Sequence, residues 1–503
     1  MRARISSTTR PPERPTFQRR ISKHPILTFP ERPIVEFSFQ GEMFKGYEGE
    51  PIAAALAANG TRIYRYTEKL HRARGFFCAV GKCSACLMEV DDRPNVMVCM
   101  EALKAGMRIR RQEGRGHINP SAVPVSLPAP DFTTPTQTCP VAPESVELAI
   151  VGGGPAGLSA ALTAARLGLS PLLIDDNPTL GGQLIKQTHK FFGSRSLYCG
   201  IRGIDIARIL GTEVRQTETK ALLGASCIGY FHDHILGIAL SDRLIMLKAR
   251  SLIFATGAGE NTIAFPGCDL PGVMGAGAIQ TMVNVHGVRP GRRVLMVGAG
   301  NIGLIVSYQL LQAGVDVACV VDVLPEISGY HVHAAKLVRL GVPILTRHTI
   351  VEVLGREEVE GAVIAQVDGR NRPINRTRQR LDVDTVCLAV GLSPLSELVR
   401  MTGCRMVYVR ELGGLVAWHN EDMQTSIPGV LVAGDLSGIE EASTAMLEGR
   451  IAGAAAYEWL RSPSSDSRCL RDSAKAELSE IRKGQFGAKA HQGKEILRRL
   501  ARN

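Results

Sequence analysis

The stretch that decides the fold is LAIVGGGPAG at residues 148–157, an apolar run that ends in a glycine-rich turn before an alanine-rich segment. A second stretch of the same kind, VLMVGAGNIG, occupies residues 294–303. In each case the next apolar run ends in an acid, Asp175 or Asp322, placed 23 or 24 residues after the first glycine. Strand, glycine turn, helix and strand make a βαβ unit with a right-handed crossover. The sequence therefore predicts an α/β fold with two Rossmann-like dinucleotide-binding domains.

Both turns have the chemistry of a pyrophosphate site. Glycines let the backbone approach the phosphates, the helix N-terminus supplies donors, and the acid accepts hydrogen bonds from the ribose. No Arg or Lys follows Asp322 within the next turn, so a 2'-phosphate would meet Glu326, and we expect NAD rather than NADP there. The residues predicted to bind a nucleotide are Gly152, Gly154, Pro155, Ala156, Gly157 and Asp175 in the first motif, and Gly298, Gly300, Asn301, Gly303 and Asp322 in the second.

Four cysteines are clustered ahead of the first motif. Cys78, Cys83, Cys86 and Cys99 have the spacing C-x4-C-x2-C-x12-C, whose first three members match the plant-type 2Fe-2S loop. Structural zinc is the alternative, but zinc sites usually show paired C-x2-C knuckles and this loop has one. We expect Gly75 and Gly81 to let the backbone close round the cluster.

Several further segments distinguish a flavin site from a second nicotinamide site. Residues 425–435 (TSIPGVLVAGD) end a strand with an acid placed for a sugar-alcohol chain, and the helix after it could stabilise negative charge on a reduced flavin. The alternative is that these are only strand-ending turns of a Rossmann-like sheet. Because no C-x2-C pair occurs outside the cluster loop, disulfide reductase chemistry is excluded. We assign FAD to the first motif, with additional contacts from Gly182, Gln183, Thr256, Gly257, Gly434 and Asp435.

Composition sets the outer limits. The chain has 503 residues and a net charge of +11, but each end carries +6 and residues 36–460 hold 40 basic and 41 acidic side chains. A neutral body argues against nucleic-acid binding. No apolar stretch is long enough to span a membrane. Twelve cysteines without a secretory segment indicate a reducing compartment, so we expect a cytoplasmic protein.

The pattern changes along the chain predict seven parts. The expected bounds are a basic disordered tail at 1–33, a small α+β (β-grasp) 2Fe-2S ferredoxin-like domain at 34–115, a proline-rich linker at 116–145, the first half of the FAD domain at 146–288, the NAD-type domain at 289–385, the second half of the FAD domain at 386–460, and a basic tail at 461–503.

This combination resembles a known family. A 2Fe-2S module fused to a two-dinucleotide-binding flavoprotein, with GGQLIKQTHKFFGS (181–194), LPGVMGAGAIQTMVNVHG (270–287) and GIEEASTAMLEGR (438–450), is similar to the α subunits of heteromeric amine dehydrogenases. These include sarcosine oxidase α chains, opine oxidase and hydrogen cyanide synthase subunits, and dye-linked proline and hydroxyproline dehydrogenases. The resemblance covers about residues 34–460. It implies two partners, a β subunit, itself a D-amino-acid-oxidase-like flavoprotein, that oxidises the amine, and a small ferredoxin-like subunit.

The resemblance also has departures. Many relatives carry a cysteine-rich module at the C-terminus, whereas only Cys469 follows residue 460, so we expect no second cluster. Some members hold NAD or ATP where the flavin would bind, and Asp175 would serve any ribose.

No residue stands out as a catalytic acid or base. Lys186 and His189 lie beside the predicted flavin loop, His232 and His234 lie in FHDH, and Glu440 and Glu441 precede a helix, but a structural role is the more common one for each type, and none is assigned to catalysis. Three functions stay open: an electron-transferring α subunit for an amino-acid or secondary-amine substrate, a self-contained NADH-dependent reductase, and a nucleotide-binding scaffold. The absence of an obvious acid-base set favours a partner-dependent chain over a stand-alone amine oxidase.

Overall fold

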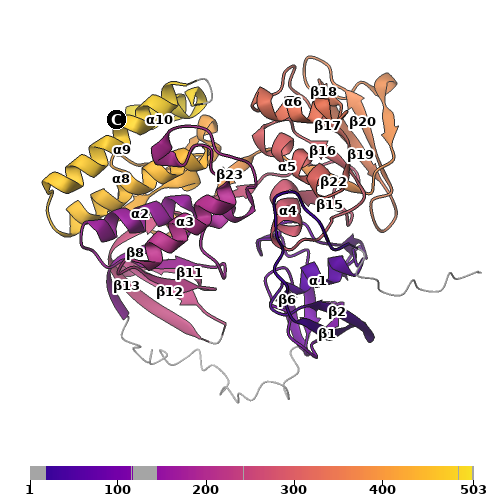
Figure 1. Cartoon of the computed structure of the whole chain (residues 1–503), viewed down its shortest axis with the longest axis horizontal. Coiled ribbons are helices and arrows are strands. Elements are labelled where there is room, and N and C mark those ends of the chain that lie inside the picture. The colour runs from indigo at the N-terminus through magenta and orange to yellow at the C-terminus, as the bar shows by residue number, and fades with distance from the viewer. Residues whose placement is uncertain (1–18, 115, 117–143, 242, 485–486, 501–503) are drawn as a thin grey trace, which may run out of the picture. The chain divides into compact units, whose positions relative to one another are not determined.

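The computed structural model describes residues 19–114, 116, 144–241, 243–484 and 487–500 (Figure 1). The chain forms two compact units, the first from residues 1–126 and 263–389, the second from 127–262 and 390–503. The described part of each unit has its own continuous apolar core. The predicted linker, 116–145, lies almost wholly outside the described residues.

The N-terminal module of the first unit is a small mixed sheet with one helix, as predicted for a ferredoxin-like module. Strands β1 (Ile34–Phe39) and β2 (Glu42–Tyr47) form a hairpin, because Gln40 and Gly41 both adopt the left-handed backbone that its two-residue turn needs. Helix α1 (Ile52–Ala58) is small-sided and wholly buried. The sheet has the order β2-β1-β7-β5-β6. Its other strands are β5 (Leu87–Val90), β6 (Arg93–Met97) and β7 (Arg108–Arg110). A separate two-stranded ladder is formed by β3 (Arg65–Tyr66) and β4 (Ala73–Arg74).

The second part of the first unit is a parallel sheet of order β15-β22-β16-β17-β18. Its apolar strands are buried, as sheets covered by helices require. The elements are β15 (Val273–Gly275), α4 (Ala276–Gln280), a short π-helix (Thr281–Val285), β16 (Arg293–Val297), α5 (Asn301–Gln312), β17 (Asp316–Asp322), α6 (His331–Arg339), β18 (Ile344–Thr346) and β22 (Thr385–Leu388), with the antiparallel strands β19 (His348–Leu354), β20 (Gly361–Gln366) and β21 (Gln379–Leu381).

The boundary of this part differs from the predicted one. Residues 263–288 were expected in the FAD domain, but β15 pairs with β22 and α4 packs against α5, so the segment belongs to the NAD-type sheet. The physical reason is that β15 is an edge strand of three residues, too short for its hydrophobic pattern to indicate which sheet it joins.

The N-terminal module is fixed to this sheet within the first unit. The Arg62 guanidinium, 8% exposed, pairs with Asp384 at 3.4 Å and donates to the Pro290 carbonyl at 3.3 Å. Arg20 pairs with the buried Glu50 and donates to the His286 carbonyl at 3.0 Å. Residues 19–33, predicted to belong to a disordered tail, are therefore partly docked, because Ile21 buries its side chain in the core of the unit. Residues 1–18 lie outside the described residues.

The second unit is built on a mixed sheet of order β10-β9-β8-β13-β12-β11, with β26 paired to β13. The strands β10, β9, β8, β13 and β26 run parallel, and β11 and β12 form an antiparallel extension. The elements are β8 (Glu144–Val151), α2 (Pro155–Arg166), β9 (Leu172–Asp175), α3 (Gly203–Arg215), β10 (Lys220–Leu223), β11 (Ser226–Phe231), β12 (Ile235–Ala239), β13 (Leu244–Phe254), β14 (Ala258–Glu260), β23 (Leu392–Pro394), α7 (Glu397–Met401), β24 (Met406–Val409), β25 (Gly414–Ala417), β26 (Val430–Val432) and α8 (Ala442–Leu460).

The C-terminal segment corrects another prediction. Residues 461–503 were expected to form a solvated basic tail, yet they contain the helices α9 (Ser465–Lys483) and α10 (Ala488–Leu500) of the second unit (Figure 1). Helix α9 packs against α8, and α10 packs against α9 and the turn Arg410–Leu412. Apolar side chains recur on one face of each helix and are buried, Leu478 on α9 and Leu497 on α10 among them. Ser464 also caps α9 through a capping box with Ser467. The high charge of the segment is explained by the exposed faces of amphipathic helices.

Across the described part of the chain, every helix is either too short or too polar to cross a bilayer.

Candidate functional site

The first glycine motif forms the turn between β8 and α2. Gly152 has φ +111°, and a side chain there would place its Cβ 2.2 Å from the Ala255 carbonyl oxygen. At Gly157 the added Cβ would lie 1.8 Å from the Gly152 carbonyl oxygen. At Gly154, by contrast, the nearest atom to such a Cβ is the Gly182 Cα, at 3.9 Å. The outer glycines are thus required because a Cβ on either would clash with a carbonyl oxygen, whereas a Cβ on the middle one would make only an ordinary van der Waals contact, as expected where a phosphate approaches.

The second motif repeats this geometry between β16 and α5. A Cβ at Gly298 or Gly303 would lie 2.2 Å or 1.9 Å from a carbonyl oxygen, whereas at Gly300 the nearest atom is the Ser328 Oγ at 3.5 Å. Asn301 at the start of α5 accepts a hydrogen bond from the Tyr330 backbone N–H at 2.7 Å. Both loops are therefore shaped to receive a pyrophosphate at a helix N-terminus.

The two acids also have matching environments. An Asp175 carboxylate oxygen accepts a hydrogen bond from the Gly153 N–H, and the other accepts one from the Asn177 N–H at 2.7 Å. Asp322 accepts in the same way from Ala299 at 2.7 Å and from Leu324 at 2.9 Å. Each acid therefore holds its own glycine loop in place, in addition to any hydrogen bond that it would accept from a ribose.

The residues predicted for the first site come together within the second unit. The position of a Cβ on Gly152 is 3.3 Å from the Thr256 backbone nitrogen, and that of a Cβ on Gly434 is 2.9 Å from the Ala156 Cβ. Gly182 begins a 3-10 turn (Gly182–Lys186) that also contains Gln183, whose side chain is exposed. Pro155 occupies the first turn of α2, where its missing N–H costs nothing. The chain thus brings the first glycine loop, the 182–183 turn, Thr256 and the Gly434–Leu436 turn to one place.

Thr256 and Gly257 connect the two halves of this unit. The Thr256 hydroxyl donates to the Leu395 carbonyl at 2.8 Å, and the Leu395 N–H donates to the Gly257 carbonyl at 3.0 Å. Gly257 has φ +72°, a conformation that favours glycine. The neighbouring strands β14 and β23 pair antiparallel from Ala258 to Glu260. These contacts give Thr256 and Gly257 a structural role in joining the two halves of the unit.

Asp435 lies in the 3-10 turn Gly434–Leu436, just before α8. Burial raises the pKa of its carboxyl to about 7, and repulsion from Glu448 and Glu440 acts in the same direction. Its oxygen accepts a hydrogen bond from the Glu440 backbone N–H at 3.3 Å. A partly protonated carboxyl at neutral pH can both donate to and accept from a sugar hydroxyl.

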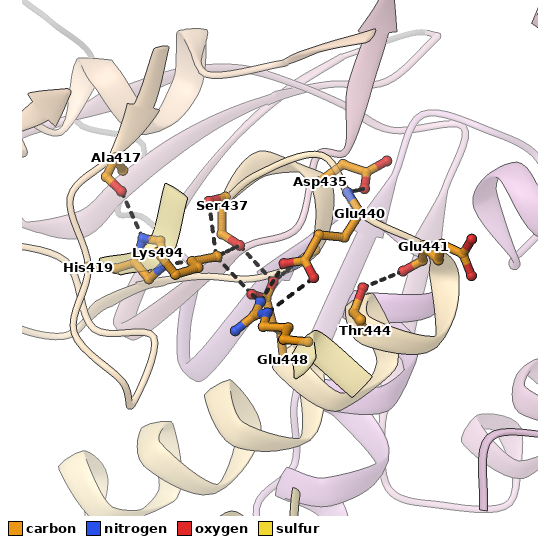
Figure 2. A network of polar contacts seen from close by, with 11 residues as sticks. Ala417, His419, Asp435, Ser437, Glu440, Glu441, Thr444, Glu448 and Lys494 are labelled. Atoms are coloured by element: carbon orange, nitrogen blue, oxygen red, sulfur yellow. Dashed lines mark hydrogen bonds and ion pairs between the residues drawn. The ribbon is translucent and has the colours of Figure 1, made fainter. Parts of the chain in front are cut away.

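A buried network behind this turn was missed by sequence reasoning (Figure 2). Glu448 of α8 accepts hydrogen bonds from the Gly434 N–H at 2.9 Å and from the Ser437 hydroxyl at 2.6 Å. It also pairs with Lys494 of α10 at 2.8 Å and with Arg482 of α9 at 2.6 Å. Glu448 lies within the segment 438–450 that carries the family resemblance, but a local sequence pattern could not connect it with Arg482 and Lys494, which lie in the segment predicted to be a basic tail. Glu440 proves to be a partner of Arg482, and Glu441 is the N-cap residue of α8 with no capping side-chain hydrogen bond.

The four cluster cysteines are neighbours in the first unit. Cys78 and Cys83 lie in the loop between β4 and β5, Cys86 directly precedes β5, and Cys99 follows β6. Contact with the Cys83 and Cys99 thiols lowers the pKa of Cys78, and contact with Cys99 lowers the pKa of Cys86, while the same contacts raise the pKa of Cys83 and Cys99. The thiols thus form one connected set, although no three His, Cys, Asp or Glu side chains in the described ranges surround a single metal position. A connected set of four thiols is the donor set that a 2Fe-2S cluster takes.

The glycines of this loop have separate roles. Gly81 has φ +65°, so it turns the chain between the first two cysteines. A Cβ at Gly75 would lie 2.5 Å from the Arg62 carbonyl oxygen. Gly75 is therefore required by its packing against Arg62.

The remaining polar candidates show structural surroundings. Lys186 is 5% exposed, and burial lowers its pKa to about 8, opposed by the charge of Glu260. His189 stacks on Phe191 with ring centroids 5.4 Å apart. His232 and His234 lie in a 3-10 turn with no buried residue.

Two glycine loops with paired acids, one of them joined to a second turn that ends in an acid, define an oxidoreductase class that binds two dinucleotides. Residues 146–449 match the family Pyridine nucleotide-disulphide oxidoreductase, and the chain belongs to that family. Residues 32–114 match the 2Fe-2S iron-sulfur cluster binding domain. The predicted flavoprotein class, the family resemblance, and FAD and a 2Fe-2S cluster as the cofactors are thereby confirmed, whereas the residues assigned to each cofactor stay predictions.

Curated relatives have the same character. The chain is 27% identical over 478 residues to the alpha subunit of sarcosine oxidase from Rhizobium meliloti, a match that covers 83% of this chain and 45% of the relative. It is 28% identical to the HcnB subunit of hydrogen cyanide synthase from Pseudomonas aeruginosa, covering 60% of this chain and 69% of the relative. The chain thus spans less than half of the sarcosine oxidase relative.

Among solved structures, L-proline dehydrogenase from P. horikoshii superposes with a TM-score of 0.68 at 23% identity. The superposition covers 92% of this chain and 79% of that one. At this identity the likeness establishes the fold.

Proposed function

We propose that this chain is the electron-transferring α subunit of a heteromeric flavin-dependent dehydrogenase or oxidase for an amino acid or secondary amine of the sarcosine, proline, hydroxyproline or opine class. The observation that carries the proposal is the joining of a four-thiol module to a two-loop oxidoreductase in one chain. The match to the alpha chain of a sarcosine oxidase over 83% of this chain supports the substrate class.

We assign FAD to the first loop and its surrounding turns. Gly154 leaves space for the pyrophosphate, Asp175 fixes the loop beside the ribose, and Asp435 would bind the sugar-alcohol chain. Cys78, Cys83, Cys86 and Cys99 would hold the 2Fe-2S cluster. FAD when bound can accept electrons as a pair and release them one at a time, which transfer to the cluster requires because the cluster carries single electrons.

Partners follow from the same reasoning. The relatives are named as subunits, which supports two partners, a D-amino-acid-oxidase-like flavoprotein that oxidises the amine as the β subunit, and a small ferredoxin-like subunit. We also propose a cytoplasmic location, because a reducing compartment would keep the twelve cysteines as thiols and leave those of the cluster loop available for iron.

The decisive experiment is anaerobic spectroscopy of the purified chain. We expect flavin bands and cluster absorption, with bleaching by L-proline or sarcosine only when the β subunit, expressed from a neighbouring gene, is present. A preparation without flavin and iron would contradict the proposal.

A pair of variants assigns the flavin to its loop. Gly154→Ala should fold, because its Cβ would make only an ordinary van der Waals contact at 3.9 Å, but it should lose flavin and keep iron. Gly300→Ala makes the same change in the second loop and should keep both. Equal flavin content in the two variants would contradict the assignment.

The second candidate is a self-contained NADH-dependent reductase. It is favoured by the second loop, which has the full geometry of a nucleotide site, including an Asp322 carboxylate bonded to Ala299 at 2.7 Å. Complete bleaching of the flavin by NADH alone would favour it over the first proposal.

A further inference from the structure

The turn that would hold the sugar-alcohol chain of FAD is fixed from behind by a single carboxylate. Gly434, with φ +71°, donates its N–H to Glu448 at 2.9 Å, and the Ser437 hydroxyl donates to the same oxygen at 2.6 Å. The Glu448 side chain is 2% exposed. The positions of Gly434 and Ser437, at the two ends of the turn, therefore depend on the position and the negative charge of the Glu448 carboxylate.

The charge of Glu448 is maintained by the C-terminal helices. Burial alone would raise the pKa of its carboxyl, but the charges of Lys494 and Arg482 lower it to about 2. Arg482 also pairs with Glu440, so its guanidinium serves two carboxylates. The second cation is Lys494, which pairs directly with Glu448, whereas Glu440 is paired with Arg482. With Lys494 in place, the two negative charges of Glu440 and Glu448 are matched by the two positive charges of Arg482 and Lys494.

Lys494 is held in a way that suits this role. Its ammonium donates to the Ser437 hydroxyl at 2.8 Å, the Ser437 carbonyl at 3.1 Å and His419 Nε2 at 3.1 Å (Figure 2). The other ring nitrogen of His419 lies 2.8 Å from the Ala417 carbonyl, so it carries the proton and leaves Nε2 free to accept. Burial and the Lys494 charge lower the pKa of His419 to about 3, so the ring is neutral at physiological pH. Lys494 therefore contacts the turn directly and through Glu448.

We propose that Lys494 is a positioning residue of the flavin site, and that α9 and α10 complete this site. Lys494 fixes the Gly434–Ser437 segment and neutralises Glu448 behind it. The inference rests on the proposed binding of FAD at the first loop. Without Lys494, Arg482 alone would face Glu440 and Glu448, and one uncompensated negative charge would lie behind the turn. Such a charge would weaken the binding of an anionic cofactor and disfavour its anionic reduced form.

The test uses the full-length protein with three variants. Lys494→Met removes the charge and keeps the length of the side chain, whereas Lys489→Met makes the same change on the exposed face of α10. The double variant Glu448→Gln/Lys494→Met restores neutrality without the ion pair. The FAD dissociation constant is measured by titrating apoprotein, and the flavin midpoint potential at saturating FAD. Circular dichroism and the iron content report whether each variant is folded.

For Lys494→Met we expect a dissociation constant raised at least tenfold and a more negative midpoint potential. The double variant should regain part of both, and Lys489→Met should behave as the wild type. A folded Lys494→Met protein with unchanged affinity and potential would overturn the inference. If this variant fails to fold, Ser437→Ala decides, with an expected loss of about threefold in affinity; unchanged affinity there would overturn it as well. A wild-type protein that binds no FAD would contradict the proposed function instead.

Discussion

The packing of α8 on α2 makes the substitution Gly449→Ala a strong test of the second unit. A Cβ at Gly449 would lie 2.1 Å from the Ala156 carbonyl oxygen, more than 1 Å inside van der Waals contact, taken as about 3.4 Å. The obstacle is backbone in the first turn of α2, so no rotamer can relieve it. The two helices must separate, and the glycine loop ahead of Ala156 must move with them.

The magnitude follows from two opposing effects. Overpacking a close contact costs about 1–3 kcal/mol, and a rigid carbonyl places this site at the upper end. Replacing glycine by alanine inside a helix returns about 1 kcal/mol. We therefore expect a net loss of about 2 kcal/mol, or about 4–8 °C in the melting temperature of a unit of this size.

The matched control is Gly211→Ala in α3. There the added Cβ would meet the Leu180 Cβ at 3.7 Å, an ordinary contact, so only the helix-propensity gain of about 1 kcal/mol applies. The two substitutions are chemically the same and should change stability in opposite directions. Thermal unfolding of the apoproteins, followed by circular dichroism, measures both. A Gly449→Ala protein as stable as the wild type would refute the description of this helix contact.

Three further perturbations test other parts of the molecule. Cys86→Ser should abolish the cluster absorption and lower the iron content while leaving flavin bound; unchanged iron would overturn the ligand assignment. Arg62→Met removes a nearly buried cation from Asp384 and should destabilise the first unit by about 3 kcal/mol. The control Lys45→Met, at the exposed pair with Glu36, should cost less than about 1 kcal/mol. Equal melting temperatures of these two variants would contradict the docking of the N-terminal module. The lowered pKa of His419, about 3 against an ordinary 6.5, means that the unfolded chain binds a proton that the folded chain refuses, so the histidine makes stability fall as pH drops from about 6.5 toward 3. His419→Asn should remove this component, seen as a flatter pH dependence of the melting temperature relative to wild type, and parallel curves would be the contrary result.

The sequence was sufficient where the chemistry is local. The glycine turns, their following acids and the cysteine spacing are each contained in a short segment, and the conformation that they require depends mainly on neighbouring backbone atoms. Gly157, for example, is demanded by the carbonyl oxygen of Gly152 in the same turn.

Features that depend on distant contacts could not be predicted in this way. Lys494 meets Glu448 from 46 residues away and Arg482 meets it from 34, and no periodicity connects such positions. The composition of residues 461–503 indicated solvation because a charged exposed face dominates the average, although the apolar face is long enough to build two helices. The strand β15 has three residues, so its sheet is decided by the register with β22 alone.

The two glycine loops illustrate why the local motif cannot distinguish their ligands. They share the same steric demands at the outer glycines and the same hydrogen bond from the loop to the following acid. They differ in what tertiary packing brings to them. Helix α2 is contacted by α8, whose glycines allow an approach close enough to place Gly434 beside Ala156 at the start of α2, whereas α5 packs against α4 and α6. The turn beside the first loop is in turn fixed by Glu448 and Lys494. The assignment of FAD to the first loop therefore depends on residues 434–494 as much as on the glycines, and a variant that alters only this region should affect flavin binding while leaving the second loop intact.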